Sequence, residues 1–280
     1  MFQSNLLKGR TIFLTGGGTG LGRSMALRFA ELGANLFLAA RREEPLAETA
    51  KEIRAKGGKA SFATCDVREY TAVERAIESA EREFGGVDTL VNNAAGNFIA
   101  RTEKLSPNAF NAVVGIVLQG SFYCTLALGK KWIAAHQPGT VLNIVTTYAE
   151  WGSGFVVPSA CAKAGVLAMT RSLAVEWARH RIRFNAIAPG PFPTEGAFSR
   201  LMPSKEFEEH AKETHPMKRF GRHEELANLA VYLISDQSEY VNGECVVIDG
   251  GLWLRGAGEF NDLLELPDAV WEMMEQSRKR

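Results

Sequence analysis

The sequence predicts a doubly wound α/β fold, with a parallel sheet of about seven strands and helices on both faces. Short β-rich runs alternate with longer helical patterns along most of the 280 residues, and most of these runs are almost continuously apolar. Strands that are covered by helices on both faces have this character. A repeated strand–helix–strand order gives a parallel sheet with right-handed crossovers. A glycine-rich segment after the first run also fits such a fold.

The expected elements follow one another without a Pro/Ser-rich linker or an internal repeat, so we predict a single domain over residues 1–280. The expected strands are residues 11–14, 35–40, 61–64, 89–91, 141–145, 183–187 and 245–248. The expected helices include residues 22–32, 45–55, 72–83, 120–136 and 162–179.

Two segments interrupt this alternation. Residues 191–216 connect a strand to a helix, and a connection of this length predicts a lid over a substrate. The alternative is a surface excursion with a short helix. The tail, residues 252–280, carries many apolar side chains, which predicts that it docks on another surface, such as a neighbouring subunit. These side chains are Trp253, Phe260, Leu263, Leu264 and Trp271.

Composition argues against several kinds of partner. The chain is 46% hydrophobic and 23% charged, as in proteins that bury a full core. Its formal net charge is zero, so we expect no nucleic-acid partner and no attraction to a charged membrane surface. No uninterrupted apolar run reaches the ~20 residues of a membrane span, and residues 1–10 are too few for a signal peptide. We therefore expect a cytoplasmic location without membrane insertion.

Neither the cysteines nor the histidines have the spacing of metal ligands, so no metal site is expected. We predict that the cysteines are reduced thiols in or near the core, and that the histidines lie on the surface or in loops. The four cysteines are Cys65, Cys124, Cys161 and Cys245.

A glycine-rich loop, residues 15–22 (TGGGTGLG), lies between the first expected strand and the first expected helix. Glycines let the backbone turn tightly there, and they let a pyrophosphate approach the helix N-terminus, whose free N–H groups favour anions. A glycine-rich run alone is a weak signal. At the first strand-to-helix turn of an alternating chain it predicts a dinucleotide site.

This loop and three further motifs resemble the short-chain dehydrogenase/reductase family. The spacing of Gly16, Gly20 and Gly22 matches the TGxxxGxG loop of that family. The other matching motifs are residues 65–67 (CDV), 92–96 (NNAAG) and 189–191 (PGP). The resemblance covers roughly residues 9–251. It implies a Rossmann-type fold, a nicotinamide cofactor and, from the usual assembly of the family, a homotetramer.

The resemblance also implies which residues contact the cofactor. Asp66 would accept a hydrogen bond from the adenine amino group, and Lys163 would hold the nicotinamide ribose. The remaining implied contacts are Thr15, Gly16, Gly18, Thr19, Gly20, Leu21, Asn93, Ala94, Ala95, Pro189, Gly190 and Phe192.

The end of the second expected strand indicates NADP(H). An NAD site places a carboxylate there to bind the ribose hydroxyls, and that charge would repel a 2′-phosphate. Ala40 occupies this place, and Arg41 follows it with a planar fork of donors that suits a phosphate. A solvated arginine is the alternative, but it leaves the missing carboxylate unexplained.

The usual catalytic residues of the family are largely replaced. Lys163 fits the family lysine, but the position four residues earlier, where the family has its tyrosine, is Ser159. The family serine falls on Thr146 and the family asparagine on Val117. These changes disfavour a simple ketone reductase.

One subgroup, the 2,4-dienoyl-CoA reductases, departs from the family in the same way. Its working tyrosine lies fifteen residues before the lysine, which is Tyr148 here, and the partner asparagine of that tyrosine matches Asn97. The segments that carry this resemblance are residues 92–98 (NNAAGNF), 147–163 (TYAEWGSGFVVPSACAK), 190–201 (GPFPTEGAFSRL) and 258–263 (GEFNDL).

The chemistry explains a displaced tyrosine. A dienoyl thioester takes hydride at C5, and negative charge then spreads along the conjugated chain to the thioester oxygen. Donors must therefore lie several bond lengths from the nicotinamide, where Tyr148 and Asn97 would form an oxyanion site. Protonation at C2 would give a 3-enoyl-CoA. Ser159 and Thr146 would position a water molecule or the cofactor.

The subgroup resemblance also implies four contacts to an acyl-CoA substrate. Arg68 and Arg200 would bind CoA phosphates, because arginine presents several donors in a fixed geometry. Phe98 and Ser106 would contact the substrate as well. Taken singly, each arginine is also consistent with a solvated surface charge.

Alternatives remain open. The chain could reduce another carbonyl or enoyl substrate, with Tyr148 as the acid, although Val156 replaces the tyrosine that enoyl-carrier-protein reductases have seven residues before the lysine. It could also be a non-catalytic NADP-binding protein, with Tyr148 as a packed aromatic residue. The retained Lys163 disfavours that interpretation. The leading prediction is an NADPH-dependent 2,4-dienoyl-CoA reductase of fatty-acid β-oxidation.

Overall fold

The structure, a computed structural model, describes residues 2–194 and 204–277. It contains a seven-stranded sheet in the order β3-β2-β1-β4-β5-β6-β7, and every neighbouring pair is parallel. This confirms the predicted fold class. The strands are β1 (Thr11–Thr15), β2 (Asn35–Ala40), β3 (Lys59–Thr64), β4 (Thr89–Asn92), β5 (Gly139–Ile144), β6 (Ile182–Pro189) and β7 (Cys245–Ile248).

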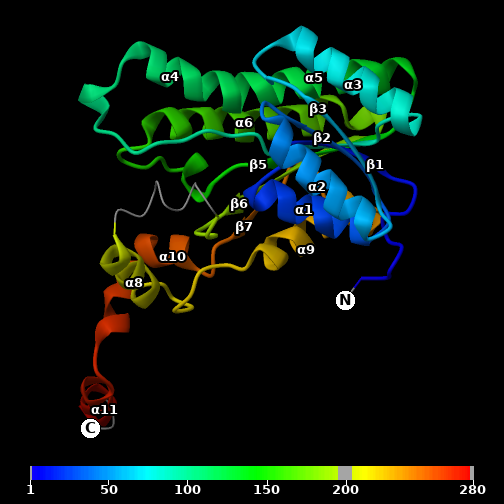
Figure 1. The fold of residues 1–280 in the computed structure, drawn as a ribbon. Helices are drawn as coiled ribbons and strands as arrows, with labels where there is room; N and C mark the ends of the chain where they lie inside the picture. The colour runs from blue at the N-terminus through cyan, green and yellow to red at the C-terminus, as the bar shows by residue number, and fades with distance from the viewer. Residues whose placement is uncertain (1, 195–203, 278–280) are drawn as a thin grey trace.

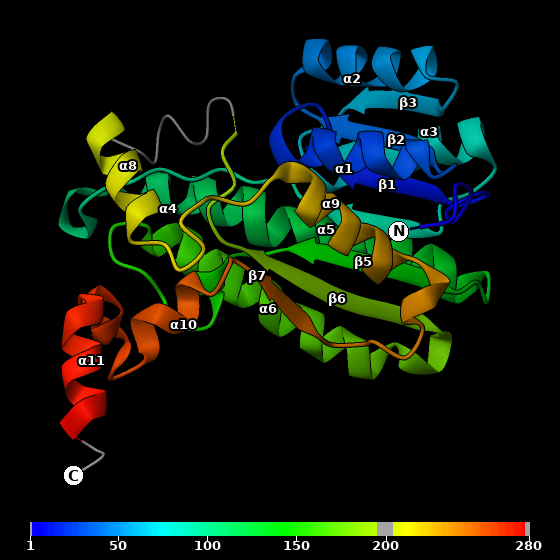
Figure 2. The ribbon, with the colours of Figure 1, turned by 90° about the horizontal axis from the view of Figure 1, so that it is seen from below.

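Helices cover both faces of the sheet, with α1, α2 and α9 on one side and α3, α5 and α6 on the other (Figures 1 and 2). On the first side these are α1 (Gly20–Glu31), α2 (Glu43–Ala55) and α9 (His223–Ile234). On the second side they are α3 (Tyr70–Phe84), α4 (Pro107–Val114), α5 (Gly120–Ala134) and α6 (Val157–Glu176). Three further helices lie outside these two layers, namely α8 (Lys205–Glu213) before α9, and α10 (Leu252–Ala257) and α11 (Asp268–Ser277) after β7.

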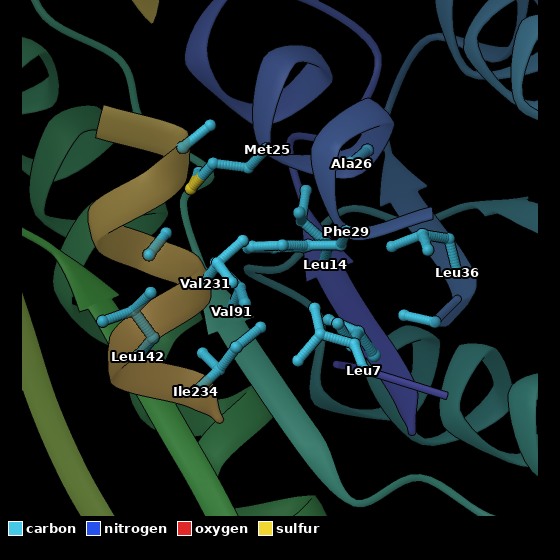
Figure 3. Packing of buried hydrophobic residues seen from close by; sticks show 14 of the residues in the cluster. Leu7, Leu14, Met25, Ala26, Phe29, Leu36, Val91, Leu142, Val231 and Ile234 are labelled. Atoms are coloured by element: carbon cyan, nitrogen blue, oxygen red, sulfur yellow. The ribbon is translucent and has the colours of Figure 1, made fainter. Parts of the chain in front are cut away.

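Alternate residues of each strand enter opposite cores, as the two-residue period of a strand requires. Leu14 of β1 packs with Phe29 of α1 and Val231 of α9 on the first side (Figure 3). Phe13, its neighbour in β1, points to the second side and stacks on Phe37 of β2 with ring centroids 5.7 Å apart. Burial on both sides accounts for the continuous apolar runs in the sequence.

The second core is centred on Trp132 of α5, which is 1% exposed. Its ring lies against Gly139 at the start of β5, where a Cβ atom would come within 2.4 Å of it. Its indole N–H donates to the carbonyl of Val87 at 2.6 Å. The tryptophan thereby joins α5 to the strands beneath it by packing and by a satisfied polar group.

Helix α6 begins five residues earlier than residue 162, the first residue predicted. Its first residue is Val157, and Pro158 follows in the first turn. The backbone N–H groups of the first turn have no partner within the helix, so the N–H that proline lacks costs nothing there. The proline therefore starts this helix instead of preceding it. As a consequence, Ser159 lies in the first turn of α6, one helical turn before Lys163.

One helical run has the composition of a membrane span, although the sequence analysis predicted no such run. Residues Pro107–Ala134, comprising α4, the π-helical turn η2 (Gly115–Gln119) and α5, are long and apolar enough by these two criteria alone. Half of the most apolar window is buried inside the protein. Contacts of this run with α3 and α6 explain its apolar character, because it is a core helix of the α/β fold.

The two irregular segments have only partly described structures. The predicted lid, residues 191–216, contains the short helix α8, while its residues 195–203 lie outside the described part of the chain. In the tail, α10 touches the body through Trp253, whose ring lies 5.5 Å from that of Trp151. Phe260 and Leu264 are 72% and 66% exposed, so the described tail leaves these apolar side chains uncovered within one chain.

The thiols are free, as predicted, although not all are in the core. Cys65 and Cys124 are buried, Cys245 is half-buried, and Cys161 is exposed on α6. Burial raises the pKa of the Cys65 thiol to about 11, so this group stays protonated at neutral pH.

Replacing Trp132 with alanine tests the second core. Removing this buried ring leaves a cavity and an unpaired Val87 carbonyl, so we expect Trp132→Ala to lower the free energy of unfolding by about 3–5 kcal/mol. Trp151→Ala is the matched control, because this tryptophan is 71% exposed, and we expect a loss below about 1 kcal/mol. Urea denaturation followed by circular dichroism measures both values. Equal losses in the two variants would contradict the assignment of Trp132 to the core.

Candidate active site

The candidate site lies at the carboxyl edge of the sheet, where four central strands end. Thr15 ends β1, Asn92 ends β4, Ile144 ends β5 and Pro189 ends β6. Because these strands are parallel and adjacent, the loops that follow them meet at one edge. In open α/β sheets ligands bind in the crevice at this edge.

The glycine-rich loop is shaped by left-handed backbone at two glycines and by a close approach at a third. Gly16 has φ +69° and Gly20 has φ +54°, a region that glycine enters without strain. Gly22 lies against the carbonyl of Gly16, where a Cβ atom would come within 2.1 Å of the oxygen. The loop therefore needs glycine at these positions to bring the N-terminus of α1 under the cleft.

Thr15 and Asn93 hold this loop against β4. The Thr15 hydroxyl accepts from the backbone N–H groups of Asn93 and Ala94, both at 3.0 Å, and donates to Val91 at 3.3 Å. The Asn93 amide donates to the carbonyls of Thr15 and Gly16 at 3.1 and 3.2 Å. The structure thus uses Thr15 and Asn93, both predicted cofactor contacts, to build the wall of the site.

Next to the loop is a cleft of about 410 Å³. It brings together predicted cofactor contacts from four separate stretches of sequence. Its lining includes Gly16, Gly18, Thr19, Arg41, Asp66, Ala94 and Ala95. A Cβ atom at Gly18 would lie 3.0 Å from the backbone in the first turn of α2, so glycine lets the loop pack closely on that helix. The glycine loop, a helix N-terminus and the two arginines Arg41 and Arg42, which both line the cleft, suit the diphosphate and ribose of a dinucleotide.

Asp66 and Arg68 form an ion pair at the far end of the cleft. The Arg68 guanidinium donates to both carboxylate oxygens, with distances of 2.9, 3.1 and 2.5 Å. The hydrogen bonds from Arg68 and the nearby charge of Arg41 hold the pKa of the Asp66 carboxyl below its usual value. A carboxylate with this lowered pKa is an acceptor over the whole neutral range. The stem of Arg68 runs past Gly115 in the π-helical turn η2.

Three predicted catalytic side chains meet at one point. The Tyr148 hydroxyl lies 3.3 Å from the amide nitrogen of Asn97, which donates to it, and 3.1 Å from the Ser159 hydroxyl. Tyr148 comes from the 3-10 turn η3 (Thr147–Ala149) after β5, Asn97 from the loop after β4, and Ser159 from the first turn of α6. The side-chain oxygen of Asn97 accepts a hydrogen bond from the backbone N–H of Phe98 at 2.9 Å. This contact fixes the side-chain amide so that its nitrogen faces the phenol.

Ser159 makes a contact that the sequence did not predict. It bonds the Tyr148 hydroxyl and is itself 2% exposed. Its predicted role in positioning water or the cofactor stays a prediction. Eleven residues separate the two side chains, and only the fold of the η3–α6 connection brings them together.

Lys163 is buried beneath this cluster. It is 6% exposed, and its ammonium donates to the carbonyl of Ile144 at the end of β5. Desolvation lowers the pKa of Lys163 to about 8. The lysine is therefore a poorly solvated cation, with spare donors for hydroxyl groups that enter the site.

The hydroxyl of Thr146 is buried and has no hydrogen-bond partner within the described residues. Buried polar atoms without a partner are rare and often belong to a ligand site. Thr146 lies two residues after Ile144, so this hydroxyl and the Lys163 ammonium flank the same strand end. Together with the glycine loop and the cleft, they fit the nicotinamide half of a dinucleotide.

Other predicted site residues have mainly structural surroundings. Phe98 packs in the third core cluster with Val117, Gly190 makes close contact with Asp249, and Phe192 packs on Gly221. The Ser106 hydroxyl caps α4 by accepting from Ala109 at 3.2 Å. Leu21 starts α1 beside the loop and Pro189 ends β6. Arg200 lies outside the described residues. No group of three or more potential metal ligands occurs in the described ranges.

Comparisons with known proteins agree with this geometry. A family model described as enoyl-(acyl carrier protein) reductase, of the short-chain dehydrogenase type, matches residues 16–253. A probable 2,4-dienoyl-CoA reductase [(2E)-enoyl-CoA-producing] from Bacillus subtilis is 46% identical over 88% of this chain and 97% of its own length. A probable 2,4-dienoyl-CoA reductase 3 [(3E)-enoyl-CoA-producing] from Caenorhabditis elegans is 44% identical over 90% of this chain and 82% of its own length.

Solved structures show the same fold. A short-chain dehydrogenase from Bacillus anthracis is 43% identical, with a TM-score of 0.81 over 88% of this chain and 97% of that one. A gluconate 5-dehydrogenase from Burkholderia cenocepacia, crystallised with NADP and tartrate, is 33% identical, with a TM-score of 0.82 over 89% of this chain and 97% of that one.

The buried ammonium of Lys163 gives a prediction for the cofactor-free protein. Its folded pKa, about 8, lies below the ordinary lysine pKa of 10.5, so between these pH values the unfolded chain binds a proton that the folded chain does not. The stability cost of burying the charged ammonium is therefore fully present below pH 8 and disappears toward pH 10.5. We expect Lys163→Met to stabilise the free protein at pH 7 by about 1–3 kcal/mol, and this advantage should shrink as the pH rises through that window.

Thermal unfolding from pH 6 to 10.5 measures this difference, with Lys56→Met as the control. The side chain of Lys56 is 69% exposed, so its replacement should leave the pH dependence of stability unchanged. A stability difference between Lys163→Met and wild type that does not vary with pH would show that Lys163 has an ordinary pKa.

Proposed function

Because this chain belongs to the short-chain dehydrogenase/reductase family, we propose that it is an NADPH-dependent 2,4-dienoyl-CoA reductase that forms a 3-enoyl-CoA. The observation that carries the proposal is the joint position of Tyr148 and Asn97. The residue at the usual tyrosine position of the family, Ser159, supports the displaced phenol instead of acting as the acid. The names of the Bacillus subtilis and Caenorhabditis elegans relatives support the same substrate class.

NADPH, when bound, supplies the hydride that the conjugated chain accepts at C5. The chain's own residues stabilise the charge that this transfer creates. Tyr148 and Asn97 would donate to the thioester oxygen, where the charge is concentrated four carbons from the hydride acceptor. A preorganised donor of this kind is commonly worth ~10²–10³ in rate. The Ser159 hydroxyl would keep the phenol pointed at this place, because it is a second partner of the phenol oxygen beside Asn97.

Lys163 and Thr146 would serve the cofactor side of the reaction. The Lys163 ammonium has donors for the ribose hydroxyls, and the Thr146 hydroxyl lacks a partner among the described residues. The ammonium is charged at neutral pH, because its lowered pKa of about 8 still lies above 7. Burial keeps this charge strong, because little water screens it.

The product double bond follows from where the charge is held. The names of the two relatives differ on this point, since one is a (2E)-enoyl and the other a (3E)-enoyl producer. Donors on the thioester oxygen hold the enolate next to C2, so a proton delivered at C2 leaves the double bond at C3. Product analysis by NMR with the purified enzyme distinguishes the 3-enoyl from the 2-enoyl thioester.

The choice of NADPH rests on the end of β2. Ala40 and Arg41 line the cleft where an NAD site would have a carboxylate. Arg42 also lines this part of the cleft and adds a second positive charge. The NADP complex of the Burkholderia cenocepacia relative supports the same cofactor.

The cellular context is also part of the proposal. Reduction of 2,4-dienoyl thioesters removes a conjugated system that the β-oxidation of unsaturated acyl chains produces. We propose a cytoplasmic enzyme that acts as a homotetramer, with an acyl-CoA bound through Arg68 and without nucleic-acid or membrane partners. The exposed apolar side chains of the tail, Phe260 and Leu264, are consistent with burial against another subunit.

Tyr148→Phe tests the proposed oxyanion site. Removal of the phenol hydroxyl deletes one donor, so we expect kcat for 2,4-hexadienoyl-CoA to fall about 10²–10³-fold. The dissociation constant for NADPH should change less than about twofold, since the phenol contacts the substrate. Tyr240→Phe is the control, because this tyrosine is fully exposed, and it should retain wild-type activity.

The same spectrophotometric assay separates the proposed substrate class from other carbonyl or enoyl substrates. We expect the wild type to prefer hexadienoyl-CoA over acetoacetyl-CoA in kcat/KM. A preference for the ketone, or near-normal activity of Tyr148→Phe, would rule out the proposed function.

Arg41→Ala tests the cofactor preference. Loss of one charge-assisted contact to the 2′-phosphate should raise KM for NADPH roughly 10–100-fold. KM for NADH, which lacks this phosphate, should change less than about threefold. The exposed Arg82 of α3 provides the control variant, Arg82→Ala. If Arg41→Ala weakened both cofactors equally, the arginine would not be the determinant of NADPH selectivity.

A further inference from the structure

His223 joins three parts of the molecule, namely α9, α1 and the segment that follows β6. It is the first residue of α9, which lies beside α1 (Figures 1 and 2). Its Nδ1 lies 2.8 Å from the hydroxyl of Ser24 on α1. Its Nε2 lies 2.5 Å from the carbonyl oxygen of Pro193, in the segment that follows β6.

The segment 191–194, which we call the entry segment, runs from β6 over the glycine-rich loop. Its last residue, Thr194, has a methyl group only 3.3 Å from where a Cβ atom on Gly20 would be. Pro191 accepts a hydrogen bond from the N–H of Gly221 at 3.0 Å, and the Phe192 ring packs on Gly221. The residues just before α9 therefore hold the first half of the entry segment, and His223 holds the second half.

The N-terminus of α9 is itself well fixed. Glu225 accepts from the backbone of Arg222 at 2.8 Å and from the guanidinium of Arg219 at 2.9 and 2.8 Å. The hydrogen bonds from Arg219 lower the pKa of Glu225 to about 2, so this carboxylate stays charged. His223 is thus presented from a rigid turn, with little freedom to give up its two partners.

The hydrogen bonds can be satisfied in either charge state of the ring. A carbonyl oxygen only accepts, so Nε2 must carry a proton to bond Pro193. In the neutral ring, Nδ1 then accepts from the Ser24 hydroxyl. In the charged ring, Nδ1 donates to Ser24, whose own proton turns to the carbonyl of Gly20 at 3.1 Å. The link from the glycine loop to Pro193 therefore persists in both states.

We propose that His223 is a positioning residue for the nicotinamide cofactor. His223 does this by holding the entry segment against the glycine-rich loop. The segment covers Gly20, the first residue of α1, whose free N–H groups face the diphosphate position. Fixing this cover in advance avoids an ordering cost on binding. The inference rests on the proposed function only for the identity of the cofactor.

The test measures cofactor binding directly. We expect His223→Ala to raise the dissociation constant for NADPH, measured by isothermal titration calorimetry on the full chain, about 10-fold. The kcat for the dienoyl substrate should change less than threefold, because His223 lies away from the reacting atoms. His223→Gln, whose amide nitrogen can still donate to Pro193, should restore binding to within threefold of wild type. Glu224→Gln, at the exposed neighbouring position, is the matched control.

Two results would overturn the inference: unchanged NADPH affinity in His223→Ala, or an equal loss in His223→Ala and His223→Gln. If His223→Ala fails to fold, Ser24→Ala tests the inference instead, since it removes the hydroxyl that bonds Nδ1 of His223. An increase of at least threefold in the dissociation constant for NADPH supports the role of His223. An unchanged dissociation constant rejects it. The titration uses whichever of NADPH and NADH binds the wild type more tightly. An error in the proposed cofactor therefore appears in the wild type, separately from the effect of His223.

Discussion

Burial of the parallel sheet on both faces is the constraint on which the rest of the structure depends. The central strands supply apolar side chains to two cores, and most of the predicted site residues lie at the strand ends and in the loops after them. Thr15, Asn92, Ile144 and Pro189 end adjacent strands at one edge. The cofactor cleft and the Tyr148 cluster lie at this edge, because the loops after adjacent parallel strands meet there.

The site is built from groups that are poorly satisfied in the protein alone. The Lys163 ammonium is desolvated, with its pKa lowered to about 8, and the Thr146 hydroxyl has no described partner. Each of these states costs stability. A bound ligand with hydroxyl and amide groups would relieve both. The local loss of stability is therefore a consequence of a site that is preorganised for a polar ligand.

The position of the Tyr148 phenol distinguishes this site from one with a tyrosine at position 159, where the family usually has it. A serine at position 159 leaves room in the first turn of α6, and its hydroxyl orients Tyr148 from η3. The phenol also accepts from the Asn97 amide, so it is held by a donor and by a second hydroxyl. This arrangement places a phenol away from the usual tyrosine position without altering the lysine or the nucleotide loop. One scaffold can thus reduce a different atom of a longer conjugated substrate.

The sequence by itself determined the fold class and the glycine loop, and it predicted the cleft residues Arg41 and Asp66 and the candidate residues Tyr148, Asn97 and Lys163. These features are local: periodicity, glycine spacing and fixed distances along the chain are visible without coordinates. Only the tertiary structure decided the hydrogen bond between Ser159 and Tyr148, the burial of Lys163, and the link from Ser24 through His223 to Pro193. The physical reason is that contacts across separate elements depend on helix packing and on where each helix begins, as Pro158 shows for α6. A short-range pattern contains no information about either.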